Sequence, residues 1–534
     1  MMRWKNPVTA LAAIAALSLT VSGCTGGSKS SNSNGSSGKT LVVNNNFDLK
    51  TLDPARAFEF TDVMIEHQVY ETALTYHGNE TSKLYPEVAT YSRSSDDRVV
   101  TLKLTGDHQF ADGSKVTADD IVFSYNRLEG IGGNPSFLLN DPSGKPVVVK
   151  KSGPSTVTLT SSVANPALPS ILPNPALSIL EKKVLVAHGG TTTSSDKAQK
   201  YLDEHSLGSA TYQITNSQIA TSVSLGTNPH YTGTAPGYSK VVIQNVVPAT
   251  QKVNLQSGTA QLALDVDPQS AAQMVNSKKF AETASPSLNT IYAWFNTDAK
   301  YGGPVANNNF VLAVRHAIDY SSLIKLAGPG STQPGGVIPE GIIGALKSDS
   351  HNTYDPVQAK RYLKKSGYHG QPIKFTVDSQ ASAGNASYTT IAQKIQAQLS
   401  AVGINLNLVP QPSVTSLSTY RSGTFPAGLA SWGADYPDPS DYIAFGPGQN
   451  LGKRVAWKTG TSSSADKVEP LLTTALTTSD PSKRVSAWES VQKQMNADGP
   501  FVPLLQPGAL IIYAAGIKNV PSNPIWTTEF RDIK

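Results

Sequence analysis

The sequence contains very little cysteine, since Cys24 is the only one in 534 residues. A disulfide needs two cysteines, so the chain can form none within itself, and its stability must come from the size of its hydrophobic core. The length of the chain exceeds what one core usually organises, and we therefore expect two or more lobes. A hydrophobic fraction of 39% with 16% charged residues is typical of a soluble globular protein.

A large excess of basic charge is also missing. The formal net charge of +5 is small for a chain of this length, and no extended group of Lys and Arg alternates with aromatic residues. Proteins that bind nucleic acid usually carry such a basic surface. We therefore exclude nucleic acid as a partner.

Catalytic motifs are absent as well. The sequence has no GxSxG elbow, no HExxH, no P-loop and no glycine-rich dinucleotide fingerprint. Its nine histidines are scattered rather than placed at metal-ligand spacings, although histidines from distant loops could still meet in the fold. We expect a protein that is not an enzyme and that has no cofactor and no metal site.

The N-terminus carries the signals for export. Arg3 and Lys5 precede an apolar run over residues 8–21, which is too short to span a bilayer but suits the core of a signal peptide over residues 1–23. The run ends in Val21-Ser22-Gly23-Cys24, which resembles a bacterial lipobox. That resemblance implies cleavage before Cys24 and attachment of a diacylglycerol to its thiol.

The segment that follows Cys24 is suited to a tether. Residues 25–39, TGGSKSSNSNGSSGK, are almost all Gly, Ser and Asn, which cannot bury enough apolar surface to become ordered. We therefore predict that residues 24–39 are a lipidated cysteine with a flexible linker. The protein is then extracytoplasmic, anchored to the outer face of the cytoplasmic membrane.

Several local patterns predict the start of the folded part. The strand-like run TLVVN (40–44) is followed by LDPA (52–55) and by a helical stretch from Asp62 to Leu74. In FADGSKVTADDIVFSYNR (110–127), Asp112-Gly113 forms a turn, and a helix follows with Thr117 as its N-cap and Asp120 at N3.

Further segments follow in a characteristic order: LGSATYQI (207–214), SLGTNPHYTG (224–233), VNLQSGTAQLALDVDP (253–268), TIYAWFNT (290–297) and YDPVQAKRYLKKSGY (354–368). Together with the earlier segments they resemble the family 5 extracellular solute-binding proteins, the peptide and nickel receptors of ABC importers. The resemblance covers nearly the whole mature chain.

The resemblance implies an α/β fold of the periplasmic-binding-protein type, with two lobes, a hinge, a ligand cleft and an extra subdomain in the N-terminal lobe. We expect lobe I over residues 40–290 and 505–534, with the inserted subdomain at about 75–205, and lobe II over residues 291–504. The hinge should lie near TIYAWFNT and PFVPLLQ. The implied partners are a peptide or other small molecule, the permease subunits of an ABC importer and the membrane, and the receptor itself should be a monomer.

Independently of this resemblance, the residue pattern is mixed α/β. In IAQKIQAQLSAVGI (391–404), Ile391, Ile395, Leu399 and Val402 recur at spacings of three or four, which predicts an amphipathic helix. The β-rich run NLNLVPQ follows directly. Such units favour a sheet covered by helices, in which ligands bind where strands end and loops gather.

The loop SWGADYPDPSDY (431–442) is the strongest candidate for a binding site. Residues 429–432 end a predicted strand, and three aspartates follow among two prolines. In peptide-binding members of the family, an aspartate three residues after such a tryptophan pairs with the α-ammonium group of the ligand. The resemblance gives this role to Asp435, while we interpret Asp438 and Asp441 as turn or cap residues.

The other candidate ligand-binding residues are aromatic or polar. Trp432 and Tyr436 flank Asp435, and Phe58 and Phe60 lie in a loop where relatives contact ligand side chains. Trp294 and Asn296 lie at the predicted crossing between the lobes.

Recognition of a ligand carboxylate is harder to predict. Related dipeptide receptors carry an arginine before the helix that begins here near Tyr388, but VDSQASAGNAS (377–387) has no basic residue. This argues against a strict dipeptide receptor and favours longer peptides or amino-bearing ligands that are not peptides. Arg421 is a conceivable substitute, although a surface helix or loop charge is the simpler interpretation.

The sequence therefore predicts a lipid-anchored receptor that captures oligopeptides and delivers them to an ABC importer. Two alternatives stay open at this point. The same fold could bind an oligosaccharide, nickel or a metal chelate, or the chain could be an extracytoplasmic hydrolase whose residues meet only in the fold.

Overall fold

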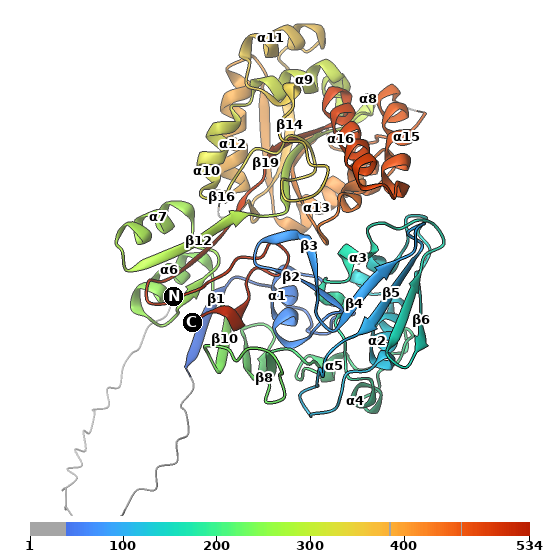
Figure 1. Cartoon of the computed structure of the whole chain (residues 1–534). Coiled ribbons are helices and arrows are strands. Elements are labelled where there is room, and N and C mark those ends of the chain that lie inside the picture. The colour runs from blue at the N-terminus through green and yellow to red at the C-terminus, as the bar shows by residue number, and fades with distance from the viewer. Residues whose placement is uncertain (1–38, 384–385, 461) are drawn as a thin grey trace, which may run out of the picture. The chain divides into compact units, whose positions relative to one another are not determined.

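The computed structural model describes residues 39–383, 386–460 and 462–534 (Figure 1). The predicted signal peptide, Cys24 and the linker up to residue 38 lie outside the described residues. Strand β1 (Thr40–Asn45) begins the described chain, as the run TLVVN predicts. No helix in the described residues is long and apolar enough to cross a bilayer.

A seven-stranded sheet surrounds β1, with the strand order β12-β20-β11-β1-β10-β9-β8. Its other strands are β8 (Tyr212–Gln218), β9 (Ser222–Thr227), β10 (Lys240–Asn245), β11 (Leu262–Ala263), β12 (Phe280–Pro286) and β20 (Gly508–Ala514). Strand β1 is parallel to β10 and β11, whereas β20 is antiparallel to β11 and β12. The sheet thus joins strands from both ends of the chain.

Several helices within residues 60–276 precede or follow strands of this sheet along the chain. They are α1 (Phe60–Val69), α3 (Leu168–Ile171), α4 (Lys182–Ala187), α5 (Gln199–Leu202), α6 (Pro248–Ser257) and α7 (Pro268–Asn276). Helix α1 ends at Val69, so the prediction of a helix up to Leu74 is wrong at its C-terminal end. The backbone of Tyr70 is already extended. Leu74 instead begins β2 (Leu74–His77), which pairs with β3 (Glu80–Pro86).

A four-stranded antiparallel sheet forms within residues 89–160, in the order β4-β5-β7-β6. Its strands are β4 (Ala89–Arg93), β5 (Val99–Leu104), β6 (Val148–Gly153) and β7 (Thr156–Thr160). Helix α2 (Ala118–Ile131) contacts β6 and β7. Its predicted start is confirmed, because Thr117 is the N-cap and its backbone N–H donates to Asp120 at 2.9 Å.

The aspartate of LDPA belongs to a buried ion-pair network. Asp53 is fully buried and accepts two hydrogen bonds of 2.7 Å from the guanidinium of Arg127. Arg127 also donates to Asp196 at 2.9 Å, and Arg56 pairs with both aspartates. Because each buried charge has partners of opposite sign, the network fixes the loop that leads from Asp53 into α1.

A five-stranded sheet is built from later segments, in the order β17-β14-β18-β13-β19. Its strands are β13 (Asn289–Phe295), β14 (Ile373–Asp378), β17 (Leu406–Gln411), β18 (Ala427–Gly433) and β19 (Phe501–Leu505). The predicted helix followed by a strand at 391–411 is confirmed as α12 (Tyr388–Ser400) and β17. The predicted strand end at residues 429–432 is likewise confirmed by β18.

Both faces of this sheet are covered by helices. Ile291, Ala293 and Phe295 of β13 pack in one core with α9 (Asn308–Ala317), α10 (Tyr320–Ala327), α11 (Pro356–Lys365) and α12. Tyr292 and Trp294 point to the opposite core, which includes residues of α13 (Ser413–Ser422), α14 (Asn450–Arg454), α15 (Ser463–Thr477) and α16 (Pro481–Asp498). Burial on both faces explains why TIYAWF is continuously apolar apart from its threonine.

Two adjacent chain crossings connect the seven-stranded and five-stranded sheets. Strand β12 continues into β13, and β19 continues into β20. At these crossings Ser287 donates its backbone N–H to the carbonyl of Pro507 at 3.0 Å, and Gln506 donates to the carbonyl of Ser287 at 2.7 Å. The crossings border TIYAWFNT and PFVPLLQ, where we expected the hinge.

The C-terminal tail returns to α1. The ring of His67 lies 2.6 Å from Glu529 and stacks on Trp526, with ring centroids 3.8 Å apart. Gln68 donates to the backbone carbonyl of Thr528 at 3.0 Å. In Figure 1 this dark red segment lies beside β1 and β10. The two ends of the described chain are therefore packed into one region.

Candidate functional site

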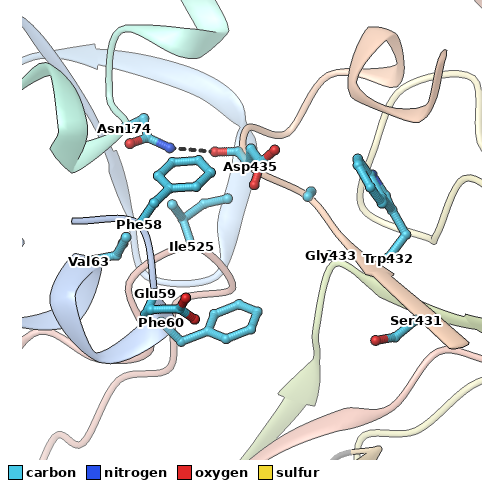
Figure 2. A pocket seen from close by; sticks show the side chains of 11 residues that line it. Phe58, Glu59, Phe60, Val63, Asn174, Ser431, Trp432, Gly433, Asp435 and Ile525 are labelled. Carbon is cyan, nitrogen blue, oxygen red and sulfur yellow. Dashed lines mark hydrogen bonds between the residues drawn. The ribbon is translucent and has the colours of Figure 1, made fainter. Parts of the chain in front are cut away.

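A cavity of about 230 Å³, which we call pocket 1, lies between the end of β18 and the loop that leads into α1 (Figure 2). Figure 2 shows the N-terminal residues on one side and the segment from Ser431 to Asp435 on the other. The lining residues are Phe58, Glu59, Phe60, Val63, Asn174, Ser431, Trp432, Gly433, Ala434, Asp435 and Ile525. Segments associated with two different sheets thus contribute to one cavity.

The backbone around Asp435 is held by side chains on both sides. Asn174 donates its carboxamide N–H to the carbonyl oxygen of Asp435 at 2.6 Å, as Figure 2 shows. One oxygen of Asp441 accepts from the indole N–H of Trp432 at 3.0 Å and from the backbone N–H of Asp435 at 3.3 Å. These contacts fix the backbone from which the Asp435 side chain projects.

Pocket 1 is electronegative. Burial raises the pKa of Asp435 to about 7, and burial together with the charge of Asp435 raises the pKa of Asp441 well above its usual range. Burial and the nearby Asp48 also raise the pKa of Glu59. Among the described lining residues there are two carboxylates, Asp435 and Glu59, and no Lys, Arg or His. A cationic group entering this cavity would meet negative charge that lacks a basic partner.

A second cavity of about 220 Å³, which we call pocket 2, lies farther back along β18. Its lining residues are Trp294, Thr376, Asp378, Ala381, Tyr388, Ser413, Ser416, Leu417, Tyr420, Leu429, Ala430, Ser431 and Arg454. Ser431 lines both cavities, so pockets 1 and 2 are neighbours. Arg454 is the only basic residue among the described residues that line pocket 2.

Comparison with protein families identifies this architecture. Residues 83–452, more than half of the chain, match the model of the bacterial extracellular solute-binding proteins, family 5. The chain belongs to this family.

The family 5 protein has curated relatives along nearly its whole length. It is 26% identical over 500 residues to the probable D,D-dipeptide-binding periplasmic protein DdpA of Escherichia coli, covering 91% of this chain and 92% of the relative. Nearly all of DdpA therefore has a counterpart in this chain.

Solved structures share the fold. The ABC transporter substrate binding protein CtaP of Listeria monocytogenes matches with a TM-score of 0.80 at 18% identity, covering 93% of this chain and 99% of CtaP. The periplasmic binding protein DppA of Helicobacter pylori, solved with the peptide STSA, matches with a TM-score of 0.72 at 21% identity, covering 93% and 98%. The predicted α/β, two-lobed periplasmic-binding-protein fold is therefore confirmed.

The family 5 protein gathers four of the predicted site residues in pocket 1. These are Asp435, Trp432, Phe58 and Phe60. The ring of Phe60 is unusual, because 61% of this large apolar residue is exposed. An exposed aromatic ring beside a cavity offers a contact surface for a ligand.

The other predicted site residues lie elsewhere. Trp294 lines pocket 2, where it stacks on Tyr420 with ring centroids 4.6 Å apart. Tyr436 packs against the core that includes residues of β4, β5, β7 and α2, and its hydroxyl lies 3.3 Å from the hydroxyl of Ser440. Asn296 is fully buried and donates to two backbone carbonyls at 2.8 and 3.0 Å. Tyr436 and Asn296 line neither pocket, and both have partners that explain them structurally.

The remaining two aspartates of the loop have structural partners. Asp438 is buried, caps the following 3-10 helix (Pro439–Phe445), and forms a bidentate ion pair with Arg484 at 2.6 and 2.8 Å. Asp441 orients Trp432 and the backbone of Asp435. Sequence reasoning described both as turn or cap residues but could not find Arg484, which lies far away in the sequence.

Several lining residues were missed by sequence reasoning. Asn174 and Ile525 come from distant segments with no local signal, and Glu59 was passed over beside two conspicuous phenylalanines. Arg421, the conceivable carboxylate partner, is exposed in the last turn of α13 and lines neither pocket. The basic residue that lines pocket 2 is instead Arg454. Within the residues that the structure describes, no three His, Cys, Asp or Glu gather as metal ligands would.

Proposed function

We propose that this family 5 protein captures oligopeptides outside the cytoplasm and delivers them to an ABC importer without changing them chemically. Relatives with peptide-binding names support a peptide cargo, as does the peptide held by the Helicobacter structure. The observation that carries the proposal is the charge of pocket 1. Two carboxylates face this cavity without a basic side chain, which suits the α-ammonium group of a peptide.

Asp435 is the proposed partner of that ammonium group. Its backbone is held on both sides by Asn174 and Asp441, so the carboxylate does not have to be positioned when the ligand arrives. Burial raises its pKa to about 7, which means that the empty site holds a poorly solvated carboxylate. A cation that replaces the lost water restores a favourable environment for the charge.

The backbone of the peptide is proposed to bind to the edge of β18. This strand pairs with β13 from Ala427 to Gly433, but with β14 only at Ala427 and Gly428. Among the described residues, 429–433 therefore have no ladder partner on their β14 side. An extended peptide can add there as a further strand, which provides affinity that is independent of its side chains.

The rest of the proposal concerns closure and location. We propose lobe I over residues 40–290 and 505–534, lobe II over residues 291–504, and bending at the crossings beside Ser287 and Gln506. Residues of both lobes line pocket 1, so a ligand there would favour the closed form. The lipobox-like segment supports an anchor at Cys24, and we propose that the receptor acts as a monomer.

Mass spectrometry of the small molecules that co-purify with the protein would test this function. The protein is expressed with its own signal peptide, purified without denaturant and then denatured to release bound molecules. We expect peptides with free N-termini, and synthetic copies should bind the ligand-free protein in calorimetry. A sugar or a metal chelate in the released fraction, with no heat from any peptide, would contradict the proposal.

A further inference from the structure

Pocket 2 presents hydrogen-bond donors that are only partly used within the described residues. The guanidinium of Arg454 lies over the ring of Tyr420, 5.0 Å from its centroid, and donates to Asn450 at 3.0 Å. Among the described residues it has no ion-pair partner. Trp294 is 1% exposed, and its indole N–H has no hydrogen-bond acceptor in the described part of the chain. A guanidinium has five N–H donors, so most of its capacity is free.

The ends of two helices add to the positive character of this cavity. Tyr388 and Ser413 are the first residues of α12 and α13, and both line pocket 2. The N-terminal end of a helix carries partial positive charge and favours an anion. Two long helices thus start at a cavity that already holds an arginine.

One carboxylate, that of Asp378, also lines pocket 2. Its Oδ1 accepts hydrogen bonds from the backbone N–H groups of Gln380 and Ala381 at 2.9 and 3.1 Å, and from the hydroxyl of Ser413 at 2.9 Å. These contacts commit Asp378 to shaping the loop before α12. It forms no ion pair with Arg454 within the described residues, so Arg454 stays available for an anionic ligand group.

We propose that Arg454 binds the C-terminal carboxylate of the peptide in pocket 2, an inference that rests on the proposed function. The planar guanidinium can hold a carboxylate through two parallel hydrogen bonds, and its stacking on Tyr420 holds it in place. The ligand is then an extended peptide whose ammonium end lies at Asp435 and whose carboxylate end lies at Arg454. A sequence search for a basic residue before α12 could not find this site, because Arg454 belongs to a later helix.

The spacing along β18 sets the length of the ligand. Leu429 of pocket 2 lies six residues before Asp435 of pocket 1, which corresponds to at most about 20 Å of extended chain. Strand β18 ends at Gly433, so the true separation is shorter. Peptides of up to about six residues would therefore span it.

Competition between peptide acids and amides would test this assignment. The ligand-free protein is incubated with randomised peptides of two to seven residues, each supplied as an equal mixture of free acid and C-terminal amide. Bound peptides are separated by gel filtration and quantified by mass spectrometry. The wild type should retain the acid over the amide by about tenfold to a hundredfold, with retention falling for peptides longer than about six residues.

Three variants make the test specific to Arg454. Arg454→Gln should abolish the preference for the acid, whereas Arg454→Lys, which keeps the charge, should restore part of it. Arg421→Gln, an exposed arginine outside both pockets, should behave as the wild type. Equal retention of acid and amide by the wild type, or an unchanged acid preference in Arg454→Gln, would overturn the assignment while leaving peptide binding intact. Failure to retain any peptide would overturn the proposed function itself.

Discussion

Replacement of Asp435 by asparagine should weaken the binding of a peptide by about a hundredfold or more. Asparagine keeps the shape of the side chain and removes only the charge. Loss of one member of a buried ion pair costs about 3 to 5 kcal/mol, and each 1.4 kcal/mol is tenfold in affinity. Glu59 lines the same cavity and partly compensates for the missing charge, which favours the lower end of this range.

The choice of pH follows from the pKa of Asp435. Burial raises this pKa to about 7, so near neutral pH a substantial fraction of the empty protein is protonated at this residue. At pH 8 the wild-type carboxylate is mostly ionised, while the peptide α-amino group, with a pKa of about 8 in water, is held protonated by the pairing itself. Calorimetry at pH 8 therefore gives the largest contrast between wild type and variant.

A double-mutant cycle separates the charge pair from other effects. The wild type and Asp435→Asn are titrated with a peptide recovered from the protein, both free and Nα-acetylated. We expect each single change to cost about a hundredfold, and the two together to cost far less than the product of the separate losses. Asp480→Asn, an exposed helix cap outside both pockets, is the matched control. Independent losses, or full affinity for the acetylated peptide, would show that Asp435 is not the ammonium site.

Four further predictions address other parts of the molecule. Peptide affinity should fall about tenfold per pH unit below pH 7, because Asp435 must lose its proton to pair with the ligand. Calorimetry from pH 5 to 8 tests this, and an affinity that does not change with pH would contradict the reasoning. Cys24→Ala should move the protein from the membrane fraction to the soluble fraction, with no lipid in its intact mass; an unchanged distribution would contradict lipidation. Small-angle scattering should show a smaller radius of gyration after peptide is added to ligand-free protein, and equal radii would count against closure. Glu66 is buried and neither of its carboxyl oxygens has a hydrogen-bond partner among the described residues, so its pKa is raised well above the usual value by burial, then by Asp62 and Asp53. Between about pH 4 and the folded-state pKa, Glu66 ionises only in the unfolded chain. The wild type should therefore lose stability relative to Glu66→Gln as pH rises through this range. The reasoning would be refuted if urea unfolding at pH 5 and pH 8 gave the same difference in unfolding free energy between the two proteins.

Local signals in the sequence predicted much of the fold. Thr117 and Asp120 mark the start of α2 because a capping box involves residues only three apart. The end of β18 and the helix before β17 were likewise predictable, since periodicity and strand propensity act within a few residues. The error at the end of α1 has the opposite cause, because the pairing of Leu74 with Pro86 in β3 overrides the local helical pattern.

Prediction of the candidate site was uneven for the same reason. The resemblance predicts a role for Asp435 from a motif within one loop, whereas residues that contact this loop come from far away in the sequence. Asn174 lies 261 residues before Asp435, and Arg484 lies 46 residues after Asp438. No local pattern marks such pairs, because they exist only when separate segments pack together. Arg454 illustrates this most clearly, since it stands in a short helix that nothing in the sequence connects with a pocket.

The position of β20 has a consequence for how the chain is assembled. This strand, residues 508–514, lies between β11 and β12, so without it β12 has no neighbour in the seven-stranded sheet. The five-stranded sheet needs nothing beyond residue 505. During synthesis the later-encoded sheet can therefore be completed first, while the sheet begun at residue 40 waits for almost the last segment of the chain. A product truncated by a few dozen residues would keep the residues of β18 that line both pockets. It would lack β20, however, and would leave open strand edges at β11 and β12. Such a product is a target for proteolysis and aggregation rather than a partly active receptor.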